Sequence, residues 1–126
     1  MQEFIAVAFG GGIGAYLRHK MSVYTKTHFQ VTCKNTFLLN IIGCLCFGVI
    51  LALVNIIPNV VNQNVKLFLT TGIIASFTTF STFAYENVIL LKDREFFKSF
   101  LYTTMSLVLG IAATYLGYMV ILKLFQ

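Results

Sequence analysis

Charged residues are scarce in this sequence of 126 residues. Lys and Arg number nine and Asp and Glu only four, whereas 58% of the chain is hydrophobic. This scarcity excludes an ordinary soluble domain, because charged residues make up about a quarter of a typical one. The basic surplus lies between apolar runs, so it indicates loops that flank a membrane and not a nucleic-acid partner.

Patterns of catalytic or metal-binding residues are also lacking. The three cysteines have no metal-ligand spacing, and the glycine cluster at residues 10–14 lacks the Lys-Ser or Lys-Thr pair of a phosphate-binding loop. We therefore expect no enzyme. No Pro-rich or Ser-rich linker divides the chain, which predicts a single domain over residues 1–126.

Four apolar stretches approach the length of about 20 residues that crosses a bilayer as an α-helix. They predict an all-α, multi-pass protein of the plasma membrane with four transmembrane helices at residues 2–19, 36–57, 67–91 and 99–124. Seven of the nine basic residues lie on the side of the loops after the first and third helices, namely Arg18, Lys20, Lys26, Lys34, Lys92, Arg94 and Lys98. Because cytoplasmic loops carry the excess of positive charge, we expect both termini outside.

Small residues at helical spacing predict where these helices pack closely against each other. In the first stretch they are Gly10 and Gly14. In the fourth stretch they are Gly110, Ala113, Thr114 and Gly117, which share one helical face.

The third apolar stretch is unusually polar at its centre. Residues 75–83 contain five hydroxyl side chains and three phenylalanines, which recur at every third position. Backbone that leaves the helical form at membrane depth must be buried in protein or line a wet cavity, and this stretch invites such an interpretation. The phenylalanine spacing by itself favours a packing stripe. The alternative is a partly dehydrated route for a small anion, formed by ring edges and hydroxyl donors without a fixed cation.

Two further polar residues allow two interpretations each. Asn40 lies within the second apolar stretch, where its amide either donates to an anion or bonds to a neighbouring helix. Glu86 follows the polar stretch. It is either a proton carrier or, as is more common for a carboxylate at the edge of a span, a solvated or paired group.

Three motifs together resemble the Fluc (CrcB) fluoride channels, a family that exports cytoplasmic fluoride passively and so protects against its toxicity. The motifs are the glycine pattern ending in arginine at residues 11–18, the Thr-to-Gly pattern at residues 36–43, and Thr-Thr-Phe-Ser-Thr-Phe at residues 78–83 followed by Glu86. The resemblance implies an antiparallel dimer with two fluoride pathways, each lined by both subunits. It also implies an interrupted third helix and a central sodium ion held by backbone carbonyls of the two interruptions.

The resemblance implies roles for individual residues as well. The fluoride pathway would comprise Asn40, Thr79, Phe80, Ser81, Thr82, Phe83, Tyr102, Ser106 and Thr114. The sodium ligands would be the carbonyls of Ala75 and Thr78, and structural positions would be Gly11, Gly14, Arg18, Thr36, Gly43 and Glu86. The family usually has glycines where this chain has Ala75 and Ser76, and a left-handed backbone angle there would be unfavourable for alanine.

The partners implied by the resemblance are fluoride, the lipid bilayer and a second subunit, either identical or paralogous. A chain that inserts in both orientations needs nearly balanced loops, whereas the basic residues here divide seven to two. This imbalance favours one orientation and a paralogous partner of the opposite orientation.

Two other functions fit a small four-helix membrane protein. A drug–proton antiporter of the small multidrug type has a similar length and dimer, but it needs a carboxylate within the membrane, and Glu86 lies near the edge of its stretch. A non-transporting membrane adaptor would show no ion flux and would tolerate loss of the polar residues.

Overall fold

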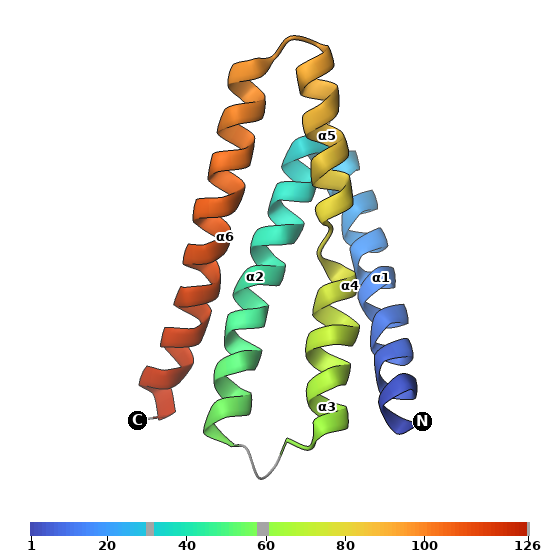
Figure 1. The fold of residues 1–126 in the computed structure, drawn as a ribbon, viewed down its shortest axis with the longest axis vertical. Helices are drawn as coiled ribbons and strands as arrows, with labels where there is room; N and C mark the ends of the chain where they lie inside the picture. The colour runs from blue at the N-terminus through green and yellow to red at the C-terminus, as the bar shows by residue number, and fades with distance from the viewer. Residues whose placement is uncertain (30–31, 58–60, 126) are drawn as a thin grey trace.

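All regular structure in residues 1–29, 32–57 and 61–125, which the computed structural model describes, is helical. The elements are α1 (Gln2–Phe29), α2 (Thr32–Ile56), α3 (Gln63–Leu67), the π-helix η1 (Phe68–Ile74), α4 (Ala75–Phe77), α5 (Phe80–Lys92) and α6 (Phe96–Phe125). They form four long columns, because α3, η1, α4 and α5 stack into one column that is interrupted between α4 and α5 (Figure 1). The start of α1 and the end of α6 lie at the same end of the bundle, as four crossings require.

Three helical stretches within the described residues are long and apolar enough to cross a membrane, namely Cys33–Ile56, Gln63–Lys92 and Phe96–Phe125. The first column is also one continuous helix, and α1 runs on to Phe29, beyond the residue 19 at which the sequence predicted the end of the first span. Arg18 and Lys20 both lie within this helix. Arg and Lys are good helix formers, and their long stems reach water from a helix.

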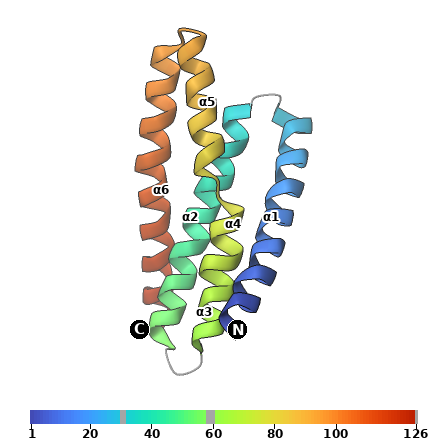
Figure 2. The same ribbon diagram turned by 45° about the vertical axis from the view of Figure 1, so that its right-hand side comes forward.

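The four columns pack in two pairs, with α1 along the column of α3, η1 and α4, and α2 along α6 (Figure 2). Gly10 and Gly14 of α1 face the backbone of η1. A Cβ added at Gly14 would overlap the carbonyl oxygen of Ile73, and one added at Gly10 would overlap that of Phe68. The predicted packing role of these two glycines is therefore confirmed.

The second pair packs through the small face of α6. Gly110, Ala113 and Gly117 are buried, and a Cβ added at Gly117 would overlap the carbonyl oxygen of Leu45 in α2. Such backbone-to-backbone approach gains van der Waals contact where lipid provides no hydrophobic drive for association. The close approach predicted for this face is confirmed.

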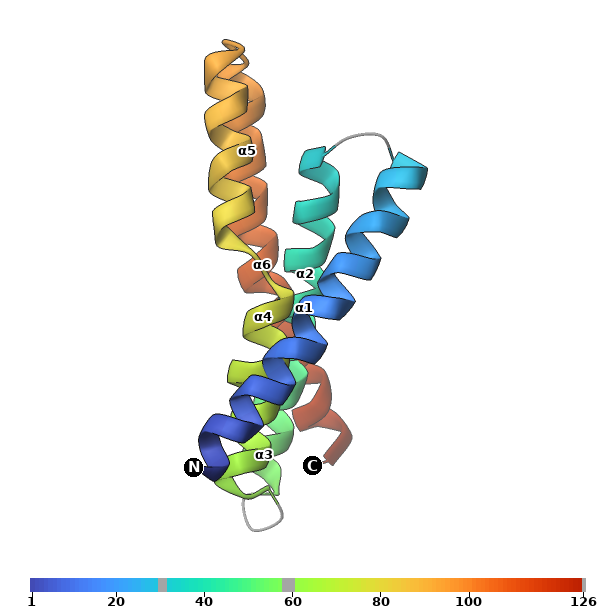
Figure 3. The ribbon, with the colours of Figure 1, turned by 90° about the vertical axis from the view of Figure 1, so that its right-hand side faces the viewer.

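At the end opposite the termini, the hairpin of α5 and α6 extends beyond the start of α2 (Figure 3). Its turn is closed by two backbone bonds, from Arg94 N to Leu91 O at 3.1 Å and from Glu95 N to Leu90 O at 2.8 Å. Arg94 has φ 59°, the single positive φ of a residue other than glycine in the described part of the chain. The hairpin therefore leaves the side of α5 and α6 that faces the start of α2 partly uncovered.

The contact between α1 and η1 leads to a prediction for Gly14. Replacing Gly14 with alanine would place a methyl group against the Ile73 carbonyl, and overpacking of this kind costs about 1 to 3 kcal/mol. We expect a lower midpoint of thermal unfolding in detergent. Gly12→Ala is the matched control, because a Cβ at Gly12 would meet nothing within 4 Å. Equal midpoints for the two variants would contradict the packing role of Gly14.

Candidate functional site

The third column is interrupted by two residues in extended conformation. Thr78 has φ −76° and ψ 158°, and Thr79 has φ −147° and ψ 108°. Both are β-branched, and this favours extended backbone over helix. Ala75, the position at which a left-handed angle would have been unfavourable, is in ordinary right-handed conformation at φ −63° and ψ −32°. The break therefore needs no glycine, and the expected penalty for alanine does not arise.

The side chain of Asn40, from α2, bonds to both backbone groups of Thr79. Thr79 N donates to Asn40 Oδ1 at 2.9 Å, and Asn40 Nδ2 donates to Thr79 O at 3.2 Å. The amide thus replaces the helical bond that Thr79 N gives up, and adds a bond to Thr79 O, the N-cap carbonyl at which the ladder of α5 begins. Because Nδ2 carries two hydrogens, this pairing leaves the second one for another acceptor.

Thr79 also caps the helix that follows the break. Its Oγ1 accepts from Thr82 N at 3.3 Å and donates to Thr82 Oγ1 at 2.9 Å. A threonine at the N-cap satisfies one of the free N–H groups in the first turn of a helix. The hydroxyl of Ser81 lies 3.4 Å from the same oxygen, so these three hydroxyls form one cluster at the start of α5.

The break releases carbonyl groups from the helical ladder, among them those of Ala75 and Thr78. In a continuous helix, Ala75 O and Thr78 O would accept from the N–H groups four residues later. Those groups belong to Thr79 and Thr82, and both donate to side chains instead. Arg18 Nη1 lies 3.5 Å from Thr78 O, a long contact that brings a permanent cation to the break.

A cavity of about 270 Å³ lies beside the break. It is lined by Asn40, Cys44, Thr78, Thr79, Phe80, Phe83, Ser106 and Leu107. Within the described residues, the side chains lining this cavity carry no charge, and the buried Ser106 Oγ has no hydrogen-bond partner. Polarity in the cavity comes from hydroxyl, amide and backbone groups alone.

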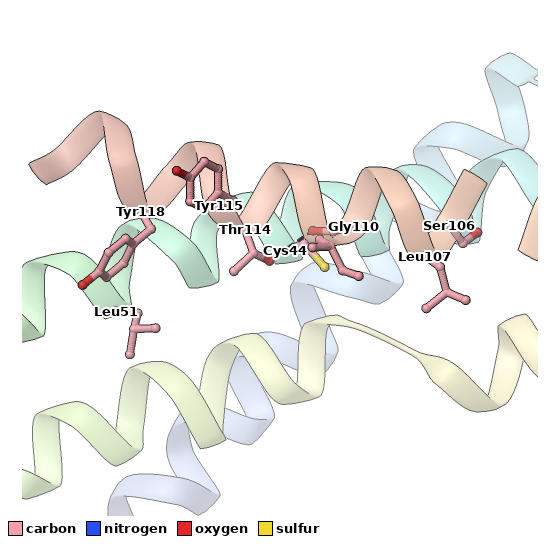
Figure 4. A pocket seen from close by; sticks show the side chains of 9 residues that line it. Cys44, Leu51, Ser106, Leu107, Gly110, Thr114, Tyr115 and Tyr118 are labelled. Carbon is pink, nitrogen blue, oxygen red and sulfur yellow. Dashed lines mark hydrogen bonds between the residues drawn. The ribbon is translucent and has the colours of Figure 1, made fainter. Parts of the chain in front are cut away.

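A longer groove of about 560 Å³ continues from this cavity along α6. Cys44, Ser106 and Leu107 line both hollows, and the groove extends along α6 past Thr114 to Tyr118. Figure 4 shows Leu107 and Thr114 of α6 and Leu51 of α2 on the same side of these helices. The hydroxyl of Thr114 donates to Gly110 O in its own helix at 3.1 Å.

Three aromatic rings form a row from the break toward α6. The ring centroids of Phe80 and Phe83 are 5.6 Å apart, and those of Phe83 and Tyr102 are 5.0 Å apart. The planes are tilted by 42° and 58°, which is compatible with edge-to-face attraction between aromatic quadrupoles. Phe80 is 78% exposed although it borders the cavity.

The family described as "CrcB-like protein, Camphor Resistance (CrcB)" matches residues 5–118 of this chain. The chain belongs to the CrcB family. It is 42% identical over 118 residues to a protein of Gloeothece citriformis named "Fluoride-specific ion channel FluC", covering 93% of this chain and 94% of that protein. Proteins with the same name from Aquifex aeolicus and Flavobacterium psychrophilum are 37% and 36% identical, covering 94% and 93% of this chain and 95% and 94% of those proteins.

Membership in the CrcB family makes this chain an all-helical, multi-pass membrane protein. The interrupted third helix, which the resemblance implied, is present at Thr78 and Thr79.

Most of the predicted pathway residues of this CrcB chain gather at the break. Asn40, Thr79, Phe80, Phe83 and Ser106 line the cavity. Ser81 and Thr82 lie on the exposed first turn of α5, and their hydroxyls approach Thr79 instead of lining the cavity. Thr114 lines the neighbouring groove.

The Tyr102 hydroxyl donates a hydrogen bond to Glu86, and Tyr102 does not line the cavity beside the break. Glu86 is only 4% exposed. It accepts from Thr36 Oγ1 at 2.6 Å and from Tyr102 OH at 2.8 Å. Of the two interpretations of Glu86, pairing is the one that this CrcB chain adopts.

Three of the residues predicted as structural, Gly11, Arg18 and Gly43, lie close to the break. A Cβ on Gly43 would overlap the Thr78 side chain, and one on Gly11 would lie 3.3 Å from Ser76 Oγ.

Sequence reasoning missed Asn87, which accepts from Ser99 Oγ at 2.7 Å and Thr103 Oγ1 at 3.1 Å and so ties α5 to α6. The signal that could have revealed it is the one that marked Asn40, an amide within an apolar stretch.

The pairing of Asn40 with Thr79 leads to a prediction for Asn40→Ala. The variant would leave the buried Thr79 N–H without a partner, at a cost of about 1 to 3 kcal/mol, and would remove one of the bonds to Thr79 O. We expect a clearly lower midpoint of thermal unfolding in detergent. Asn55→Ala is the matched control on the same helix, because Asn55 is exposed and makes only a long bond of 3.4 Å to Tyr118 OH. A midpoint for Asn40→Ala as high as that of the control would rule out the proposed support of the break.

Proposed function

We propose that this chain is a subunit of a passive, fluoride-selective channel that exports cytoplasmic fluoride across the plasma membrane and protects against its toxicity. The observation that carries the proposal is the cavity beside the break, in which amide, hydroxyl and ring-edge groups gather without a charged side chain among the described residues. The relatives named "Fluoride-specific ion channel FluC", which cover nearly all of this chain, support the same conclusion.

Fluoride would move through this cavity without most of its water. Its donors would be the second hydrogen of Asn40 Nδ2 and the unpartnered hydroxyl of Ser106, together with the positive ring edges of Phe80 and Phe83. The first turn of α5 adds the positive end of its helix dipole at the break. Neutral donors replace the water shell while binding weakly enough for the ion to leave, which conduction requires.

The complete pathway needs a second, antiparallel subunit in this proposal. Phe80 exposes 78% of its surface beside the cavity, and a partner would cover that ring and close the open groove along α6. Ser81, Thr82, Tyr102 and Thr114 would then serve as secondary contacts along the pathway. The seven-to-two division of basic residues favours a paralogous partner, and an identical partner is the alternative.

A structural sodium ion fits the carbonyl groups that the break releases. Ala75 O and Thr78 O are neutral, hard oxygen ligands that have lost their helical donors, and they lie at the negative end of the helical column before the break. A bound sodium would supply positive charge that holds the two breaks of a dimer together. The Arg18 guanidinium, 3.5 Å from Thr78 O, would share that oxygen with the ion.

The two other functions are less compatible with this geometry. A drug–proton antiporter needs a carboxylate that exchanges protons with water, whereas Glu86 is buried and paired with two hydroxyl groups. A non-transporting adaptor has no use for an interrupted helix, because polar groups at membrane depth are costly.

The direct test is fluoride efflux from liposomes that contain this chain purified alone, followed with a fluoride electrode. We expect rapid fluoride efflux and no comparable chloride efflux. Efflux from the single purified chain would also establish that identical subunits suffice. Protein of confirmed assembly that retains fluoride in its vesicles would refute the channel, unless co-reconstitution with an oppositely oriented paralogue restores the flux.

The ring edges lead to a prediction for Phe80→Ile in the same assay. Isoleucine keeps the bulk but removes the positive ring edge, and a loss of about 1.4 kcal/mol from stabilisation of the moving ion would slow flux about tenfold. Phe97→Ile is the control, because Phe97 is an exposed ring in the first turn of α6, far from the cavity. Equal flux in both variants would remove Phe80 from the pathway.

A further inference from the structure

A separate cavity of about 340 Å³ lies between the first turns of α2 and α6 and the last turns of α5. Its walls are almost wholly apolar and include Phe37, Leu90, Leu101 and Met105. The hairpin of α5 and α6 extends beyond α2 at this end of the bundle (Figure 3). None of these four residues belongs to the cavity beside the break.

Two lysines lie at the edge of this cavity. Lys34 is the third residue of α2 and Lys98 is the third residue of α6. Both helices lack an acidic residue in the first turn, so the positive ends of two helix dipoles add to the charge of the lysines. Lys98 pairs with Glu95 at 2.8 Å, whereas Lys34 has no ion pair with any described residue.

The positions of the two lysines in the sequence indicate how deep in the membrane the cavity lies. Lys34 and Lys98 each precede an apolar run that crosses the bilayer, so they lie where hydrocarbon meets headgroups. Both lie on the side that carries seven of the nine basic residues, which the positive-inside rule assigns to the cytoplasm. The cytoplasmic leaflet is rich in anionic lipid, and basic pockets between transmembrane helices on that side bind lipid headgroups.

We propose that this cavity binds one anionic phospholipid, with its phosphate between Lys34 and Lys98 and an acyl chain against Phe37 and Leu101. A water-soluble anion would meet walls with almost no polar groups, whereas a phospholipid matches both the charged edge and the apolar interior. Tyr102, which the proposed ion pathway includes, also lines this cavity, but lipid binding can be measured without any flux.

The test measures lipid binding to the purified full-length protein by native mass spectrometry. The probes are phosphatidylglycerol and phosphatidylcholine with identical acyl chains. We expect tighter binding of phosphatidylglycerol, and a loss of about thirtyfold in the double variant Lys34→Gln/Lys98→Gln, since one lysine near an anionic surface contributes roughly a fivefold gain. Binding of phosphatidylcholine should stay unchanged.

Two further variants make the result specific. Lys20→Gln/Lys92→Gln removes two exposed charges on the same side of the membrane, outside the cavity, and should leave phosphatidylglycerol binding unchanged. Leu101→Trp fills the apolar interior and should weaken the binding of both lipids. A cooperative thermal unfolding transition of this variant in lipid-free detergent would show that it is folded.

Three results would overturn the lipid site. They are equal affinity for the two lipids, equal losses in the two lysine pairs, and unchanged phosphatidylglycerol binding in Lys34→Gln/Lys98→Gln. If that variant instead slows fluoride efflux at low ionic strength from phosphatidylcholine vesicles while lipid binding is unchanged, the lysines attract permeating ions and not lipid. Failure of the channel itself would leave the lipid measurements unaffected.

Discussion

The pairing of one side-chain amide with the backbone of one residue supports the interruption of the third column. In hydrocarbon, a peptide N–H or C=O without a partner is too costly to persist. The N–H of Thr79 has left the helical ladder, and Asn40 accepts from it at 2.9 Å and donates to Thr79 O at 3.2 Å. An amide suits this task because it presents an acceptor and a donor side by side, whereas a carboxylate would offer acceptors alone. The same two bonds fix the register of α2 against the break.

A break held in this way separates two helix ends of opposite polarity. The column before it ends in carbonyl groups that have lost their helical donors, and α5 begins with N–H groups of which Thr79 caps one. Carbonyl groups favour a cation and N–H groups favour an anion. In the proposed channel, this arrangement allows a chain with little charge to form an anion pathway. The break supplies oriented dipoles, and neutral side chains supply the remaining donors.

The sequence predicted the position of the break, but not how its bonds are arranged. Hydroxyl groups at residues 75–83 and the amide of Asn40 are conspicuous because polarity is rare in apolar stretches. The bond from Asn40 to backbone depends on the register between two columns, which composition does not encode. Glu86 was placed near the edge of a span, whereas the long α5–α6 hairpin encloses it between Thr36 and Tyr102. The sequence likewise predicted neither the π-helix η1 nor the extension of α1 to Phe29.

The uneven packing of the columns determines which surface of the subunit is left for a partner. Below the break, the third column is supported by α1 through glycine contacts that bring the backbones together. Above the break, α5 contacts α6 and α2 and leaves Phe80, Ser81 and Thr82 exposed. Exposed hydroxyl groups at membrane depth need protein or water beside them, because lipid offers no hydrogen bonds. The side of the subunit on which the break opens is therefore the side that a second subunit has most reason to cover, and a pathway along that side would run between two chains and not through one.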